Sequence, residues 1–365
     1  MWNRLVRNRN LVLLWLGHVI SHSGDAIYQI ALPWLVLDLT GSKTTTSLVV
    51  LSAYLPAVVF SLASGVLADR FNRRHVMMFS DAVRMAAVLA LVLYLLGGGV
   101  SPVIIGVIAF LVAAFATLFY PARDALIPDM VSPARLTSAN AFVSTSGQFA
   151  HLAGPALAGF LVAWVGLTHL FTIDALSFGA SLLFLTLISF HRTAPRKVVA
   201  QADSHLEDLK AGLRFVRREK ALGLLLLLTA LNNLFIMGPA IIGMPIFVRE
   251  VLEMGFQAFA VIEALMAAGM LIGTALVWRY GARINPSTIL FFGMVLDGLT
   301  YSLFFGADTY LQAKCLMLLH GIGIPMITIA RTAIIQRAVP GCYRGRVFSM
   351  VNLSVVGLTA VSAAL

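Results

Sequence analysis

The sequence predicts an all-α membrane protein built from two similar halves of six helices each. Of its 365 residues, 59% are hydrophobic and only 12% are charged, whereas soluble domains carry about 25% charged residues. Apolar runs of about 18 residues or more, long enough for a helix to cross a bilayer, recur along the whole chain. A polar stretch at 191–220 separates the first six runs from the rest.

Each apolar run is expected to form a helix, because backbone groups that face lipid must satisfy their own hydrogen bonds. The first run follows a basic N-terminus without a small-residue cleavage site, so it is predicted to be a retained helix and not a signal peptide. The expected spans are 10–37, 44–68, 76–96, 101–121, 138–166, 167–190, 221–250, 256–278, 286–306, 310–336 and 347–365.

The distribution of lysine and arginine predicts a multi-pass protein of the cell membrane with a cytoplasmic N-terminus. In this orientation only Lys43, Arg249 and Lys314 lie outside and Arg84 lies within a span, as the positive-inside rule favours. This bias accounts for the net charge of +10. The sequence has no soluble module with a basic patch, so nothing in it indicates a nucleic-acid partner.

The stretch 191–220 is predicted to be a cytoplasmic linker between an N-terminal half, 1–190, and a C-terminal half, 221–365. Within it, Leu206 and Leu213 belong to one apolar face of a possible helix whose other faces are charged. Such a helix could lie along the membrane surface, or it could be a solvated linker.

The two halves share a repeated pattern of charged segments. A shift of 208 residues aligns "ARDALIPDMV" with "ARTAIIQRAV", and a shift of 209 aligns "RFNRR" with "RYGAR". Parallel repeats of this kind are a known transporter plan, with the substrate site between the halves near the midplane. The same offset predicts that the chain ends within its eleventh helix, before a twelfth.

The stretch "GVLADRFNRRHVM" concentrates charge between the second and third spans. Gly65 allows a close helix approach. Asp69 lies at the C-terminal end of its helix, where the helix dipole disfavours a carboxylate, so it is expected to interact with the N-terminus of a neighbouring helix. Asn72 is expected to take a left-handed conformation at a sharp turn. Arg73 and Arg74 can reach carboxylates or lipid phosphates.

This stretch resembles the loop signature of the major facilitator superfamily, G-x-x-x-D-R-x-G-R-R/K, with Asn72 in place of the usual glycine. The matching residues are Gly65, Asp69, Arg70, Arg73 and Arg74. The resemblance implies that the loop's Asp caps helix 11 and its Arg pairs with an acid ending helix 4, contacts that hold the outward-open state. By the same resemblance Asp124 would be that acid, and "RGRVFS", with Arg344 and Arg346, would open helix 11.

Other segments are similar to the branch of this superfamily that holds enterobactin exporters and macrolide-efflux pumps: "GDAIYQIALPWLVLDLTGS" and "VPGCYRGRVFS" are two of them. Gly154, Pro155 and Gly159 match part of the antiporter signature of family exporters, although Ala150 and Ala158 replace two of its glycines. Helix 4 lacks the mid-membrane arginine of many drug–proton antiporters.

The resemblance implies a secondary active transporter and not an enzyme. It would export a small amphipathic molecule (a drug, macrolide or siderophore-like compound) by proton antiport and alternating access. The alternatives are an uptake facilitator of the same superfamily, and a lipid flippase or transporter-like receptor. Expected partners are the small-molecule substrate, protons and membrane lipids. We expect no cofactor and a monomeric protein.

Ionisable residues inside spans are costly and usually functional. His18, His22 and Asp25 share one face of the first span at i, i+4 and i+7 spacing. His22 and Asp25 could form a proton-accepting pair, or the stripe could pack against other helices. A metal site on this face would need a further ligand.

Candidates for the central cavity also occur in the second half. Asp297 has Tyr301 one turn further on, Glu263 is a second acid within a span, and Asn232 and Asn233 could face substrate or bond to a helix neighbour. Three other ionisable residues and one pair are expected to have structural roles. Asp174 would be paired, Asp81 and Arg84 would neutralise each other, and His151 and His320 would pack.

Overall fold

The computed structural model describes residues 8–132, 136–189, 219–281, 283–339 and 341–364. In 61–70 and in parts of the helices Leu136–Val165 and Gly341–Ala364, only the main chain is described. These described ranges are helical apart from short connections and contain no strand, which confirms the predicted all-α class. The amphipathic helix expected within 191–220 lies outside them.

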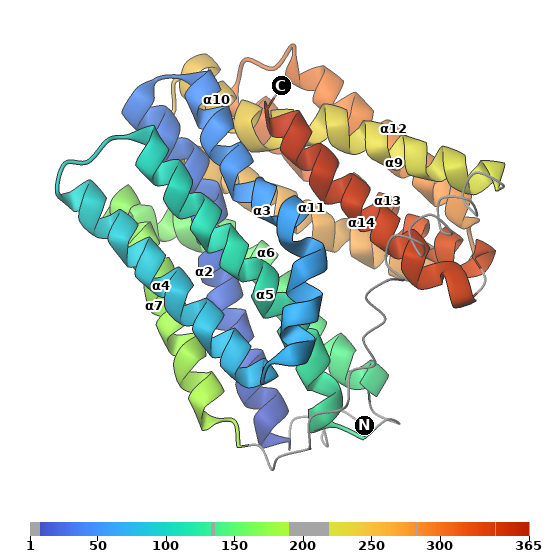
Figure 1. Cartoon of the computed structure of the whole chain (residues 1–365). Helices are drawn as coiled ribbons and strands as arrows, with labels where there is room; N and C mark the ends of the chain where they lie inside the picture. The colour runs from blue at the N-terminus through green and yellow to red at the C-terminus, as the bar shows by residue number, and fades with distance from the viewer. Residues whose placement is uncertain (1–7, 133–135, 190–218, 282, 340, 365) are drawn as a thin grey trace. The chain divides into compact units, whose positions relative to one another are not determined.

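The chain divides into two compact units, Met1–Val199 and Ala200–Leu365, and each expected span is a helix. The first unit contains α2 (Arg9–Thr40), α3 (Lys43–Arg70), α4 (Arg73–Leu96), α5 (Pro102–Met130), α6 (Leu136–Val165) and α7 (Leu167–Leu187) (Figure 1). The second contains α9 (Lys220–Gly238), η2 (Pro239–Gly243), α10 (Met244–Ile246), η3 (Phe247–Val251), α11 (Phe256–Tyr280), α12 (Pro286–Phe304), α13 (Tyr310–Ala338) and α14 (Gly341–Ala364).

Eight helices of the described part are long and apolar enough to cross a membrane. The helices α6 and α14 add shorter apolar stretches, Ala153–Val165 and Ser354–Ala363. The helix α2 has 32 residues, but polar residues lower its mean hydropathy. Because its polar side chains His18, Ser21 and Asp25 are buried, α2 faces protein on that side.

Helix pairing repeats between the two units, each considered by itself. In the first unit α2 packs on α6, α3 on α5, and α4 on α5; in the second, α9 packs on α14, α11 on α13, and α12 on α13. The matching helices α5 and α13 are both 29 residues long. The internal repeat found in the sequence is therefore also a repeat of packing.

One segment predicted to follow its helix as a loop is helical instead, and its repeat in the second half also lies at a helix end. The helix α5 continues past Pro121 and Pro128, and α13 extends to Ala338, so both copies of the repeated "AR" segment form helix ends. Proline is tolerated inside membrane helices because neighbouring groups satisfy the freed backbone atoms. Arg123 and Asp124 thus occupy fixed positions on a helix.

The helix α7 runs antiparallel to α2 and packs closely against it (Figure 1). The Nδ2 of Asn10 donates to the carbonyl of Ser189 over 2.8 Å, and its Oδ1 accepts from the amide of Ser189 over 3.3 Å. The N-terminal end of α2 therefore lies beside the C-terminal end of α7.

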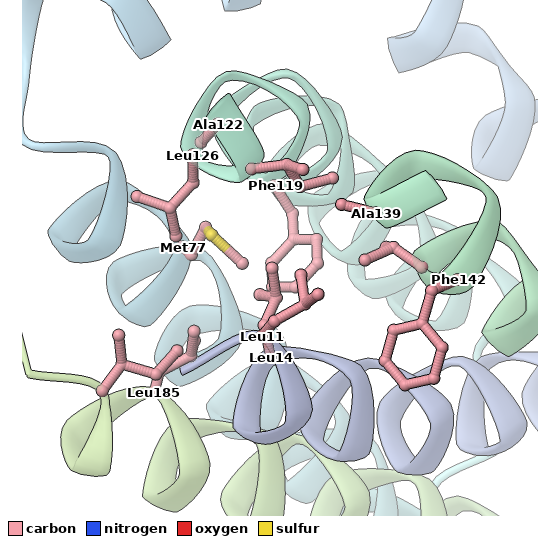
Figure 2. Packing of buried hydrophobic residues seen from close by; sticks show 12 residues of the cluster. Leu11, Leu14, Met77, Phe119, Ala122, Leu126, Ala139, Phe142 and Leu185 are labelled. Carbon is pink, nitrogen blue, oxygen red and sulfur yellow. The ribbon is translucent and has the colours of Figure 1, made fainter. Parts of the chain in front are cut away.

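A hydrophobic cluster packs the helix ends at this side of the first unit. Figure 2 shows Leu11 and Leu14 of α2 between Leu185 of α7 and Phe119 of α5, with Phe142 of α6 nearby. Leu11, Leu14 and Phe119 are almost completely buried. The cluster fixes five helices around the polar stripe of α2.

Candidate functional site

Asp25 and Arg84 form a buried ion pair halfway along α2 and α4. The Nη2 of Arg84 donates to Oδ1 of Asp25, and its Nη1 lies 3.6 Å from Oδ1 of Asp81. All three side chains are buried. The expected pair of Arg84 and Asp81 is therefore present, and Arg84 has a second, closer partner, Asp25, on another helix.

Asp174 joins this group from α7. It is fully buried, and it interacts electrostatically with three charged groups: Asp25, Arg84 and Asp81. Gly24 lets α2 approach it: a Cβ atom added there would overlap the Ser177 hydroxyl and lie 2.7 Å from Oδ1 of Asp174. We call Asp25, Asp81, Arg84 and Asp174 the ion cluster.

His22 continues the ion cluster along α2. Its Nδ1 lies 3.9 Å from Oδ2 of Asp25, so the two side chains of the predicted pair are close enough to share one proton. His18, one turn nearer the N-terminus, has its ring 5.1 Å from that of His22. Both rings contact Tyr120 of α5.

His18 bridges α2 to α5 and α6. Arg123 lies with Nη1 2.7 Å from Nε2 of His18, and Nδ1 of His18 bonds the hydroxyl of Ser146. Because a guanidinium can only donate, Nε2 is the acceptor and Nδ1 carries the hydrogen. The other side of the Arg123 guanidinium binds Asp124 over 2.6 Å.

The glycine of the predicted antiporter signature lies beside the ion cluster. A Cβ atom added to Gly154 of α6 would overlap Cβ of Ala26, the residue after Asp25. Pro155 lies inside α6, and Gly159 follows one turn later. This segment therefore brings α6 close to α2 at the depth of the ion pair.

A second buried polar group lies in the second unit. The Nδ1 of His320 on α13 lies 2.8 Å from Oδ1 of Asp297 on α12. Tyr301 contacts the His320 ring edge-on, with ring centroids 4.7 Å apart. Glu263 of α11 is close enough to interact electrostatically with Tyr301. His320, expected only to pack, thus lies closest to Asp297 among the ionisable residues described around it.

The two asparagines of α9 differ in their surroundings. Asn233 is buried and donates to the carbonyl of Thr229 in its own helix over 2.8 Å. Asn232 is half-buried. Beyond them the seventh span widens into the π-helical segments η2 and η3, which are frequent at functional sites.

The loop stretch between α3 and α4 is held by side chains that bond to main chain. Asn72 is extended, with φ −64° and ψ 115°, and its Oδ1 accepts from the amides of Arg74 and His75. It is an N-cap, so the expected left-handed conformation is wrong. Arg74 donates to the carbonyls of Leu185 and Thr186 at the end of α7, both over 2.7 Å.

Arg73 ties α4 to the end of α5. Its Nη1 lies 2.7 Å from Oδ2 of Asp129 and 2.9 Å from the carbonyl oxygen of Ala125. Asp129 thus supplies an acid at the end of α5, the fourth span, whereas Asp124, the acid expected for this role, binds Arg123. The side chains of the remaining predicted loop residues lie outside the described part: Gly65, Asp69, Arg70, Arg344 and Arg346.

Among the described residues, no group of three or more His, Cys, Asp or Glu side chains is placed to hold a metal ion. The stripe of His18, His22 and Asp25 instead contacts arginines at both ends.

Two signals could have revealed the missed residues. The first-half spans contain three acids, Asp25, Asp81 and Asp174, against one arginine, and buried charges must find partners. Counting 1.5 Å per residue from each helix end would also have matched the depths of Asp297 and His320.

Comparison with known proteins identifies the family. Residues 4–365 match the family model described as transmembrane secretion effector. Macrolide efflux protein A of Streptococcus pyogenes is 26% identical over 92% of this chain and 83% of its own length. The multidrug efflux pump Tap of Mycobacterium bovis is 31% identical over 58% of this chain and 52% of its own.

Solved structures support the same fold. A bacterial homologue of the iron transporter ferroportin, inward-facing, matches 99% of this chain and 91% of its own with a TM-score of 0.76 at 19% identity. The match to the nucleoside transporter NupG covers 97% of this chain and 89% of NupG, with a TM-score of 0.77 at 12% identity. The chain therefore belongs to the transmembrane secretion effector family of the major facilitator superfamily, whose members are membrane transporters and not enzymes.

Proposed function

We propose that this protein exports a small amphipathic molecule, such as a macrolide, from the cytoplasm in exchange for protons. The observation that carries the proposal is the ion cluster, buried at mid-depth in a chain whose relatives include a macrolide efflux protein and a multidrug efflux pump. Intramembrane acids of this kind mark proton pathways in transporters.

Asp25 is proposed as the central coupling residue, with His22 beside it. Arg84 neutralises Asp25 when the proton is absent, and a proton on Asp25 would release the guanidinium. Binding of a proton thereby changes which helices are held together. The pair of Asp297 and His320, near Glu263, is proposed as a second protonatable site.

The loop residues Arg73 and Arg74 are proposed to form a cytoplasmic latch within the first unit, together with Asp69 and Arg70. The described latch contacts join α4 to the ends of α5 and α7. Ion pairs at such helix ends can rearrange between transport states at small cost, because half-exposed pairs contribute only about 0–1 kcal/mol. Orientation with the latch and the N-terminus in the cytoplasm, in the cell membrane, follows from the positive-inside rule.

Asp129→Asn is expected to lower transport while leaving expression and thermal stability nearly unchanged. The substitution removes the partner of Arg73 at 2.7 Å, where the two side chains are 28% and 31% exposed. The measurement is the initial rate of drug export per protein at the membrane, with Asp308→Asn, an exposed carboxylate, as the matched control. Equal rates in the two variants would show that the latch does not need this pair.

The function is tested by expressing the full-length protein in a bacterial host without its own drug pumps. We expect cells to accumulate less radiolabelled erythromycin than vector-only cells, and an uncoupler to abolish the difference. Accumulation equal to that of the vector control, for erythromycin and other lipophilic drugs, would rule out drug export. Raised accumulation would identify an uptake system.

A further inference from the structure

We propose that Asp174 holds a proton within the ion cluster and passes it to Asp25 while Arg84 moves the other way. This inference rests on the proton coupling proposed above and assigns a role to a residue that the sequence predicted to be merely structural.

The first observation is that Asp174 is buried without a donor. Its side chain is completely buried, the Ser177 hydroxyl lies close to it, and no hydrogen bond of ordinary geometry from a described residue reaches either carboxylate oxygen. The nearby hydroxyl of Ser177 donates over 2.7 Å to the main-chain carbonyl of Asp174, so its single hydrogen is used. Arg84 binds Asp25. An ionised carboxylate buried without a partner is very costly, so Asp174 is neutral in this arrangement and carries a proton.

The second observation is that Arg84 is already positioned beside Asp174. Its guanidinium carbon lies 4.0 Å from the ring centroid of Phe178, and Phe178 and Asp174 are neighbours at i, i+4 on one face of α7. The Nε of Arg84 makes no hydrogen bond to a described residue. The unused donor thus belongs to a side chain that packs on Phe178, one helical turn along α7 from the residue with the unused acceptors.

The groups around Asp174 come from every helix packed on α7. Asp25 and Tyr28 face it from α2, and Asp81 and Arg84 act on it from α4. The remaining neighbour, α6, has one titratable residue, His151, whose side chain lies outside the described residues. Arg84 is the only cation in this set of described neighbours.

The transfer conserves atoms and charge. The O–H bond of Asp174 breaks, an O–H bond forms on Asp25, and the guanidinium of Arg84 exchanges Asp25 for Asp174. Because α2 and α7 are antiparallel with Asn10 beside Ser189, Asp174 lies at about the depth of Asp25. His22 lies one turn nearer the N-terminal end of α2, so the proton would pass from Asp174 across to Asp25 and then along α2 to His22.

The protonation of Asp174 is tested directly by infrared spectroscopy on the purified full-length protein at neutral pH. We expect Asp174→Asn to lose one component of the carbonyl-stretch band of protonated carboxylic acids, and Asp308→Asn to match the wild type. An unchanged band in Asp174→Asn overturns the proposal. A fall in thermal stability as large as that of Asp25→Asn would also overturn it, because asparagine closely matches a neutral acid and would weaken only an ionised one.

Proteoliposomes test whether this proton is the transported one. With an acidic lumen, we expect Asp174→Asn to accumulate radiolabelled erythromycin only to the level reached without a gradient, while its downhill exchange continues. Uphill accumulation at the wild-type rate would overturn the relay. If the wild type itself shows no gradient-driven accumulation, the proposed function fails, whereas the infrared comparison still decides the state of Asp174.

Discussion

Asp25→Asn is expected to abolish proton-driven export while sparing substrate binding and downhill exchange. Asparagine cannot take up or release a proton, and it removes the charge that holds Arg84 against α2. The measurement is accumulation of erythromycin in proteoliposomes with and without a proton gradient. Asp308→Asn serves as the control, since its carboxylate is exposed and remote from the cluster in sequence.

His22→Ala distinguishes the two members of the proposed pair. The ring of His22 lies 3.9 Å from Asp25 and can share its proton, but it is not the ion-pair partner of Arg84. This variant should therefore still export, with an altered dependence on pH. If Asp25→Asn concentrates drug at the wild-type rate, coupling lies elsewhere, and Asp297 and Glu263 are the next residues to test.

Arg84→Ala is expected to be the most destabilising change in the first unit. Removing the arginine leaves Asp25 and Asp81, its two ion-pair partners, buried without it, and breaking a buried ion pair from one side costs about 3–5 kcal/mol. The expected result is a large fall in the thermal unfolding temperature in detergent. Arg279→Ala, an exposed arginine, should unfold like the wild type.

A double variant separates charge from packing. Asp25→Asn/Arg84→Gln removes both members of the closest pair, so it should unfold at a higher temperature than Arg84→Ala and remain unable to drive uphill export. If Arg84→Ala proved as stable as Arg279→Ala, the guanidinium would not be neutralising buried carboxylates, and the ion cluster would lose its basis.

The helices could be predicted because the bilayer imposes their length and polarity. The ion-pair partners between helices could not be predicted. The sequence shows only which residues are close along the chain, whereas a long side chain can reach a residue on another helix. Sequence spacing predicts the pair of Arg84 with Asp81, which is present, but it gives no sign of the closer partner, Asp25 of α2. The acid Asp129 was missed for a related reason: the helix was expected to end near Pro121, so the residues of its last turns were treated as a loop.

The positions of polar residues within spans were more informative than their local motifs. Asp25 and Asp297 were identified as candidates from being acids in apolar helices, and both have buried ionisable partners. The partner His320 was assigned to packing because a lone histidine in an apolar helix gives no indication of which neighbouring helix it faces. Gly154 was chosen by resemblance, and its close approach to Ala26 gives that glycine a physical reason.

The central claim is that drug and proton movements are coupled in this protein, and luminal pH in proteoliposomes tests it most directly. Full-length protein is reconstituted into vesicles with an acidic lumen and a trapped pH-sensitive dye, and erythromycin is added outside. The account predicts that erythromycin makes the lumen more alkaline in wild-type vesicles and leaves it unchanged in Asp25→Asn vesicles. Erythromycin entry into wild-type vesicles without any change in luminal pH would contradict the account.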